Sequence, residues 1–226
     1  DISKKKNIIK NLSLNYDYIV NLAGHVDHTH KQKTIKSHFN GCKNLAEFFL
    51  NSKIKRFMQI GSSIEYGKMR SPQIEKKKSP KKTYSFYGRA KLLSTKLLLE
   101  FFKRYNFPIT ILRLYLVYGP KQDTNRIVPV TVMNAIYNKE FNCSSGIQKR
   151  DFIYIDDVVA AIIKVLKNKN ISGEIINIGS GKPVSIKKII LTICNTVLGG
   201  KPKFGKIKFR KDEILNLYPN IEKAKK

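Results

Sequence analysis

The sequence contains few cysteines and no long apolar run, and each shortage argues against a class of protein. Its 226 residues include three cysteines, Cys42, Cys143 and Cys194, which are odd in number and far apart. Such a set suits neither a disulfide framework nor a zinc site, so we expect a reducing compartment, the cytoplasm. No window of about 18 apolar residues occurs, so we predict no transmembrane helix. The first residues show no signal-peptide pattern.

Acidic residues are also scarce. The chain contains 16 Asp and Glu and 44 Lys and Arg, which gives a formal net charge of +28. This charge raises the question of nucleic-acid binding. Arginine is the better bidentate ligand of phosphates and bases, yet it supplies only a small part of the basic residues. The lysines are spread along the chain, and no helix-turn-helix, zinc-finger or aromatic RNA-binding signature is present. We therefore predict no nucleic-acid partner.

Apolar runs alternate with amphipathic stretches through the first half of the chain. The runs predict buried strands at 18–24, 56–60 and 109–114, and the amphipathic stretches predict helices at 34–50 and 84–105. Residues 1–15 are polar and are predicted to be irregular. Strands that are apolar throughout, with helices between them, are typical of a parallel sheet joined by right-handed crossovers. Beyond Gly119-Pro120 the predicted elements are shorter.

Tyr87 and Lys91 lie four residues apart near the start of the predicted helix at 84–105. Side chains at this spacing share a helix face, so the phenol and the ammonium can serve one site. A cation beside a phenol favours the phenolate and lowers the pKa of the tyrosine towards that of a general base. Ser62 follows a predicted strand and can present its hydroxyl at the strand end. The spacing alone is weak evidence, since a lysine-rich chain with 11 tyrosines supplies such pairs by chance.

A loop containing His25, Asp27, His28 and His30, followed by His38 on the next helix, has the residue types of a metal site. It lacks the ligand spacing and the supporting carboxylates that such sites show. We predict a polar loop after a strand, and no metal.

Seven short motifs follow one another along the chain. They are Asn21-Leu22-Ala23-Gly24, Gly61-Ser62-Ser63 through Tyr66-Gly67, Tyr87 through Lys91, Leu112-Arg113 through Val117-Tyr118-Gly119-Pro120, Arg150-Asp151-Phe152 with Asp156-Asp157, Asn177-Ile178-Gly179-Ser180-Gly181, and Arg210 through Glu213. Each is weak alone. In this order they cover nearly the whole chain, and the chain resembles the extended short-chain dehydrogenase/reductase proteins, specifically the NAD-dependent epimerase/dehydratase family that modifies nucleotide sugars.

The resemblance implies a fold and a division into domains. The fold would be α/β, a Rossmann-like doubly wound parallel sheet without its N-terminal strands, with a small C-terminal substrate-binding α/β subdomain. Residues 1–120 would form a partial NAD(P)-binding domain that carries the catalytic residues. Residues 121–226 would mainly bind the nucleotide sugar and be truncated at the C-terminus, with one or more segments returning to the sheet.

The resemblance also implies roles for individual residues. Tyr87 would be the acid/base, Lys91 would hold the nicotinamide ribose and polarise Tyr87, and Ser62, beside Ser63, would hydrogen-bond the reacting sugar oxygen. Arg150 and Arg210 match the arginines that grip the substrate diphosphate. The cofactor would be NAD, with NADP left open, and its contacts would be Asp1, Ile2, Leu22, Ala23, Gly24, Tyr87 and Lys91. The helices near 34–50 and 84–105 would form the interface of a homodimer.

The chain departs from the family pattern in three places. The glycine-rich G-x-x-G-x-x-G turn, which binds the cofactor pyrophosphate at a helix N-terminus, is absent from the 226 residues. We therefore expect a fragment or a truncated gene product that binds the cofactor poorly. His38 stands where the family usually has an Asn that helps relay protons, and Leu116 stands where an Asn usually contacts the sugar phosphate.

Within the family, the resemblance favours an NAD(P)-dependent nucleotide-sugar epimerase similar to UDP-glucose 4-epimerase, which oxidises and re-reduces a sugar carbon through a transient ketone. A nucleotide-4-ketosugar reductase and a non-catalytic remnant stay open as alternatives. A 4,6-dehydratase is less favoured, because its acid pair directly follows the catalytic Ser or Thr. Here those positions hold Ser63 and Ile64, with Glu65 one place late.

Overall fold

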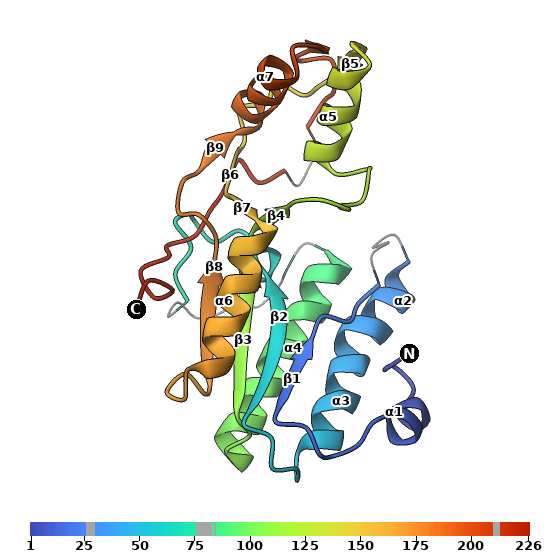
Figure 1. The fold of residues 1–226 in the computed structure, drawn as a ribbon, viewed down its shortest axis with the longest axis vertical. Helices are drawn as coiled ribbons and strands as arrows, with labels where there is room; N and C mark the ends of the chain where they lie inside the picture. Colours follow the sequence, from blue (N-terminus) through green and yellow to red (C-terminus); the bar gives the residue numbers. More distant parts are fainter. Residues whose placement is uncertain (26–29, 76–82, 84, 210–212) are drawn as a thin grey trace.

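The computed structural model describes residues 1–25, 30–75, 83, 85–209 and 213–226. Its centre is a sheet of four parallel strands in the order β1-β2-β3-β8 (Figure 1). The strands are β1 (Tyr18–Asn21), β2 (Arg56–Ser62), β3 (Ile109–Leu114) and β8 (Glu174–Ile178). The parallel sheet confirms what the alternating runs predict, and β8 brings the second half of the chain back to the sheet.

Helices cover both faces of this sheet (Figure 1). On one side lie α1 (Lys5–Asn11), α2 (Lys31–Ile35), α3 (Gly41–Phe49) and α4 (Phe86–Tyr105), and on the other lies α6 (Ile155–Lys167). Phe57 and Ile111 pack in a cluster with side chains of α3 and α4, whereas their neighbours Met58 and Leu112 pack in a second cluster with α6. Successive side chains of a strand point to opposite faces, so each strand contributes to both cores.

Two predictions about the first fifty residues are wrong. Residues 1–15 are not irregular, because α1 forms there and buries Ile8, which is 2 % exposed, against the cluster that holds α3. One buried side chain in a polar seven-residue helix leaves little periodicity to detect. The helix predicted at 34–50 begins earlier, at Lys31, and contains a π-helical turn over Lys36–Asn40 between α2 and α3.

A smaller layer lies beyond the carboxyl ends of the parallel strands (Figure 1). Its helices, α5 (Ile127–Ile136) and α7 (Ile186–Val197), pack around Ala135, Ile190 and Cys194. Its short strands are β4 (Leu116–Tyr118) with β7 (Phe152–Tyr154), β5 (Glu140–Asn142) with β10 (Lys201–Lys203), and β6 (Lys149–Arg150) between β9 (Val184–Ser185) and β11 (Asn216–Leu217). Side chains at the carboxyl ends of the sheet therefore face a second layer.

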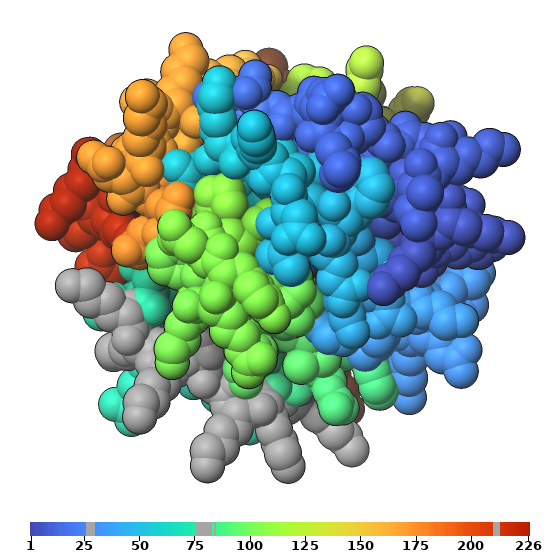
Figure 2. Space-filling view, turned by 90° about the horizontal axis from the view of Figure 1, so that it is seen from below, coloured from blue at the N-terminus to red at the C-terminus, as the bar shows by residue number. Residues whose placement is uncertain are grey.

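Seen from the opposite end, the N-terminal segment in dark blue and the C-terminal segment in red lie on opposite sides of the molecule (Figure 2). Strand β1 is an edge of the described sheet, where Tyr18 is 43 % exposed. Among the described residues, no helix has both the length and the apolar character needed to span a membrane.

Candidate active site

The end of β2 places Ser62 at the carboxyl edge of the sheet. Ser62 caps a 3₁₀ turn over Ser63–Tyr66, and its Oγ accepts a hydrogen bond from Ile64 N at 3.4 Å. The Glu65 carboxylate accepts a hydrogen bond from Ser62 N at 2.8 Å, so Ser62 and Glu65 form a capping box. This reciprocal pairing fixes the backbone of Ser62 where the strand leaves the sheet.

Helix α4 brings Tyr87 and Lys91 to the same place. Ser85 caps this helix by accepting a hydrogen bond from Gly88 N at 3.0 Å. Lys91 is 5 % exposed, and its Nζ donates to the carbonyl oxygen of Ile60 at 2.7 Å, two residues before Ser62. The side chains of Tyr87 and Ser62 are hydrogen-bonded. The structure therefore brings together Ser62, Tyr87 and Lys91, the three residues that the sequence predicts as catalytic.

Burial has the largest effect on the pKa of Tyr87. It raises this pKa, and the hydrogen bond with Ser62 opposes the change. The Lys91 ammonium lies 5.9 Å from the centroid of the Tyr87 ring and donates to a backbone carbonyl. The prediction that Lys91 lowers the pKa of this tyrosine is therefore wrong, because desolvation of the phenolate outweighs the attraction. Burial likewise lowers the pKa of Lys91, and the charge of Glu65 opposes that shift.

Most residues of the predicted cofactor set that lie outside α4 share one cavity. Asp1, Ile2, Ala23 and Gly24 line a space of about 660 Å³, within the usual range for ligand sites. The other lining residues are polar or basic, namely Ser3, Lys4, His25, Lys33, Lys36, Ser37 and Asn40. Leu22 is not among them and is 68 % exposed.

These residues fit part of a dinucleotide. The cavity at Asp1 and Ile2 has the volume for a nucleoside, and Tyr87 and Lys91 carry the hydroxyl and ammonium groups that ribose hydroxyls bind. The backbone cradle that a glycine-rich turn gives to a pyrophosphate is not present in the 226 residues. These groups would suit the two ends of a dinucleotide, and the 226 residues contain no glycine-rich cradle for its pyrophosphate.

The residues predicted to bind substrate are less closely grouped. Ser63 is only 5 % exposed. Arg150 lies at the end of β6 in the smaller layer, where its guanidinium pairs with Glu213 and donates to the carbonyl oxygen of Lys149 at 2.9 Å. Arg210 lies outside the described residues. Strand β11 pairs with β6, so the segment that follows Arg210 does return to Arg150.

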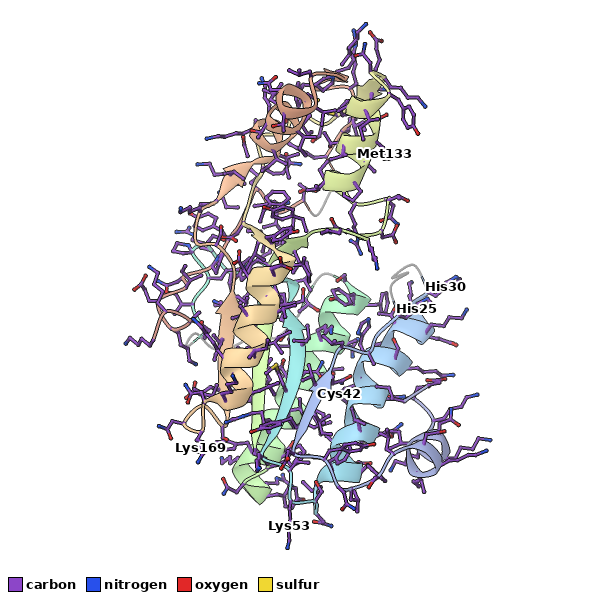
Figure 3. The ribbon with its side chains drawn as sticks, viewed as in Figure 1. His25, His30, Cys42, Lys53, Met133 and Lys169 are labelled. Atoms are coloured by element: carbon purple, nitrogen blue, oxygen red, sulfur yellow. The ribbon has the colours of Figure 1, made fainter. Side chains whose placement is uncertain are left out.

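His25 and His30 lie at the top of α2, with ring centroids 6.2 Å apart (Figure 3). Asp27 and His28, from the same loop, lie outside the described residues. The His38 ring packs edge-on against Tyr87 at 5.0 Å between centroids, and it pairs through Nε2 with the carbonyl oxygen of His25 at 3.1 Å. In the part of the chain that the structure describes, no three His, Cys, Asp or Glu side chains gather as metal ligands do.

The sequence does not predict the roles of two further residues beside the site, Glu65 and Arg126. The sequence presents Glu65 only as a misplaced dehydratase acid, but its carboxylate is fully buried, and Thr95 Oγ1 and Arg113 Nε donate to it at 2.7 and 3.0 Å. Arg126, the exposed N-cap residue of α5, acts from the smaller layer to lower the pKa of Tyr87. No local pattern marks either residue, because both roles depend on how separate elements pack.

A parallel sheet with a serine at one strand end and a Tyr-x-x-x-Lys pair on the following helix defines a Rossmann-like protein of the extended short-chain dehydrogenase/reductase class. The sequence profile of the NAD dependent epimerase/dehydratase family matches residues 1–179, and the chain belongs to this family.

Three relatives illustrate the range of the family. CDP-abequose synthase of Salmonella muenchen is 36 % identical over 111 residues, which cover 48 % of this chain and 38 % of the relative. Human dTDP-D-glucose 4,6-dehydratase is 30 % identical over 139 residues, which cover 61 % and 39 %. The crystal structure of UDP-glucuronic acid 4-epimerase from Bacillus cereus, with UDP-glucuronic acid and NAD, is 28 % identical, with a TM-score of 0.85 over 99 % of this chain and 70 % of that one. The chain thus spans about two fifths of the first curated relatives that it matches.

Proposed function

We propose that the protein in its full-length form is an NAD(P)-dependent nucleotide-sugar epimerase, which oxidises and re-reduces one sugar carbon through a transient ketone, and that the 226-residue chain alone is impaired. The observation that carries this proposal is the convergence of Ser62, Tyr87 and Lys91 at the carboxyl edge of the sheet. The likeness to an epimerase solved with NAD and a UDP-sugar supports it. NAD serves as the cofactor of the proposed reaction, and NADP stays open.

In the proposed reaction, Tyr87 takes the proton from the sugar hydroxyl, and Ser62 donates a hydrogen bond to the same oxygen. Lys91 donates to the carbonyl oxygen of Ile60, and its ammonium lies 5.9 Å from the centroid of the Tyr87 ring, where it would hold the nicotinamide ribose. NAD would supply the hydride acceptor and donor for this carbon, and Lys91 together with the residues lining the cavity at Asp1 and Ile2 would hold it. Tyr87 then gives its proton back to the oxygen, so the site ends in its starting state.

Arg150 is proposed to bind the substrate diphosphate together with Arg210. Its planar guanidinium suits a diphosphate, and its pairing with Glu213 holds it in place before substrate arrives. A diphosphate must then share or displace this carboxylate. The complete burial of Glu65 disfavours a dehydratase, because that carboxyl cannot reach a sugar from the core.

The test is the substitution Tyr87→Phe, with Tyr105→Phe as a matched control at the exposed end of α4. In the full-length form, with NAD and a panel of nucleotide sugars, Tyr87→Phe lowers turnover by roughly 10² to 10⁴, the usual contribution of general acid–base catalysis, and Tyr105→Phe does not. Proton NMR of the products identifies the epimer. Unchanged turnover in Tyr87→Phe refutes the assignment. Stoichiometric use of reduced cofactor identifies a ketoreductase instead.

We also propose a cytoplasmic homodimer formed through the helices near 34–50 and 84–105. Helices α3 and α4 lie on the same side of the sheet (Figure 1), and α4 exposes Phe86 and Tyr105 at its two ends. Light scattering at micromolar concentration measures the mass, and a monomer under these conditions contradicts the proposal.

A further inference from the structure

Helix α4 is joined to the end of β2 by three successive polar contacts. Tyr87, Lys91 and Thr95 are spaced by four residues, so they form one stripe along the helix. Tyr87 hydrogen-bonds the Ser62 side chain, and Lys91 donates to the carbonyl oxygen of Ile60. Thr95 donates from Oγ1 to Glu65 Oε2 at 2.7 Å. The first two contacts belong to the proposed catalytic set, and the third has no role in it.

The third contact lies on a completely buried carboxylate that joins three elements. Glu65 Oε1 accepts from Ser62 N at 2.8 Å, and Oε2 accepts from Thr95 Oγ1 and Arg113 Nε. Glu65 and Arg113 are both 0 % exposed, and Thr95 is 1 % exposed. The carboxylate therefore connects the end of β2 with α4 and β3.

The backbone leaves space for this carboxylate. A Cβ at Gly61 would lie 2.6 Å from Glu65 Oε1, closer than such atoms approach, so only glycine admits the carboxylate at that point. The Arg113 guanidinium, which lies 4.3 Å from the centroid of the Tyr66 ring, supplies the counter-charge. A buried charge is tolerated when it is paired and hydrogen-bonded, and Glu65 meets both conditions.

We propose that Glu65 and Thr95 are positioning residues, which fix the rotation and register of α4 on β2 and so hold the Tyr87 hydroxyl against Ser62. This inference rests on the proposed function for its catalytic meaning, but the contact itself exists in the chain without substrate. Glu65 acts through the Ser62 backbone on one side and through Thr95 on the other. Without the Thr95 contact, α4 keeps its hydrophobic packing but loses a directional contact with the strand that carries Ser62.

Thr95→Val is the sharpest variant, because it removes one hydroxyl and leaves the Glu65–Arg113 pair intact. Thr95→Ser is the conservative rescue, since it restores the hydroxyl. Thr131→Val is the matched control: Thr131 is 0 % exposed, and its hydroxyl donates within α5 to the carbonyl oxygen of Ile127 at 2.7 Å. Thermal unfolding measures how much each of the three variants destabilises the fold relative to the parent protein.

The decisive measurement is the titration of residue 87 in the full chain. Difluorotyrosine is placed at position 87, because its more acidic phenol ionises while the protein is folded, and its pKa is followed by fluorine NMR. The groups that face Tyr87 are Ser62, His38, Glu65, Lys91 and Arg126. Thr95→Val replaces none of these residues and removes one hydrogen bond, the one that Glu65 accepts from Thr95. Thr95→Val raises the pKa by about 0.5 to 1 unit, the worth of one weakened hydrogen bond to the phenolate.

The inference requires that Thr95→Ser and Thr131→Val keep the pKa of the parent protein. An unchanged pKa in Thr95→Val overturns it, as does an equal shift in Thr131→Val, since either result means that Thr95 serves stability alone. In the turnover assay, Thr95→Val lowers kcat roughly 10- to 100-fold with little change in KM, as misplacement of a catalytic group does. If the full-length form turns over no nucleotide sugar, the proposed function fails, while the titration still decides the role of Thr95.

Discussion

The ion pair between Glu65 and Arg113 gives the most direct test of how the site is supported. Both side chains are 0 % exposed, and Arg113 Nε lies 3.0 Å from Glu65 Oε2. Arg113→Met keeps apolar volume at position 113 but leaves the carboxylate without its cation. Removal of one partner from a buried pair costs about 3–5 kcal/mol, a large share of the roughly 5–15 kcal/mol that stabilises a typical domain.

The loss arises from the charge that stays behind. Without Arg113, the fully buried Glu65 carboxylate keeps its hydrogen bonds from Ser62 N and Thr95 Oγ1 but has no counter-ion. A buried charge without a counter-ion is costly, so a neutral side chain at position 65 should reduce the loss.

Urea unfolding measures the loss in free energy of unfolding, and an unchanged m-value shows that the transitions of the two proteins are comparable. The control is Arg104→Met, because Arg104 pairs with Glu100 on the exposed surface of α4 and such pairs contribute less than about 1 kcal/mol. The double variant Glu65→Gln/Arg113→Met recovers part of the loss, since the buried charge is gone. A loss below about 1 kcal/mol in Arg113→Met, or no recovery in the double variant, refutes the reasoning.

Three further predictions follow from the site and its surroundings. The 226-residue chain binds NAD weakly, and calorimetric titration shows the binding fading as salt rises, because exposed lysines are screened and no glycine-rich cradle is present; tight, salt-resistant binding contradicts this. Arg150→Ala raises the KM for a nucleotide sugar more than it changes NAD affinity, and equal nucleotide affinity in the two proteins removes Arg150 from the substrate site. Burial raises the pKa of Cys42 to about 12, so its thiol should resist iodoacetamide at pH 8 in the folded chain and react in urea. Peptide mass spectrometry measures the alkylation, and equal rates in the folded chain and in urea contradict the burial of Cys42.

The sequence alone was sufficient for the architecture, because its signals are local. Continuous apolar runs predict the parallel strands, and the structure places them side by side in one sheet. The four-residue spacing of Tyr87 and Lys91 places them on one helix face, and Ser62 ends the strand that this helix packs against. These relations need only periodicity and chain order, which a single sequence displays.

The tertiary structure decided the environment of those residues. Glu65 contacts Thr95 and Arg113, which lie 30 and 48 positions further along the chain. No local pattern encodes contacts at such separations. The sequence predicts a lowered pKa for Tyr87, whereas the structure raises it, mainly through burial. The position of Lys91 on the helix can be read from the sequence, but the burial of Tyr87 depends on distant segments. Helix α1 escapes detection for a different reason, because its one buried side chain, Ile8, leaves too little periodicity in the sequence. Residue spacing follows from the chain itself, whereas desolvation and ion pairing depend on which distant segments pack together.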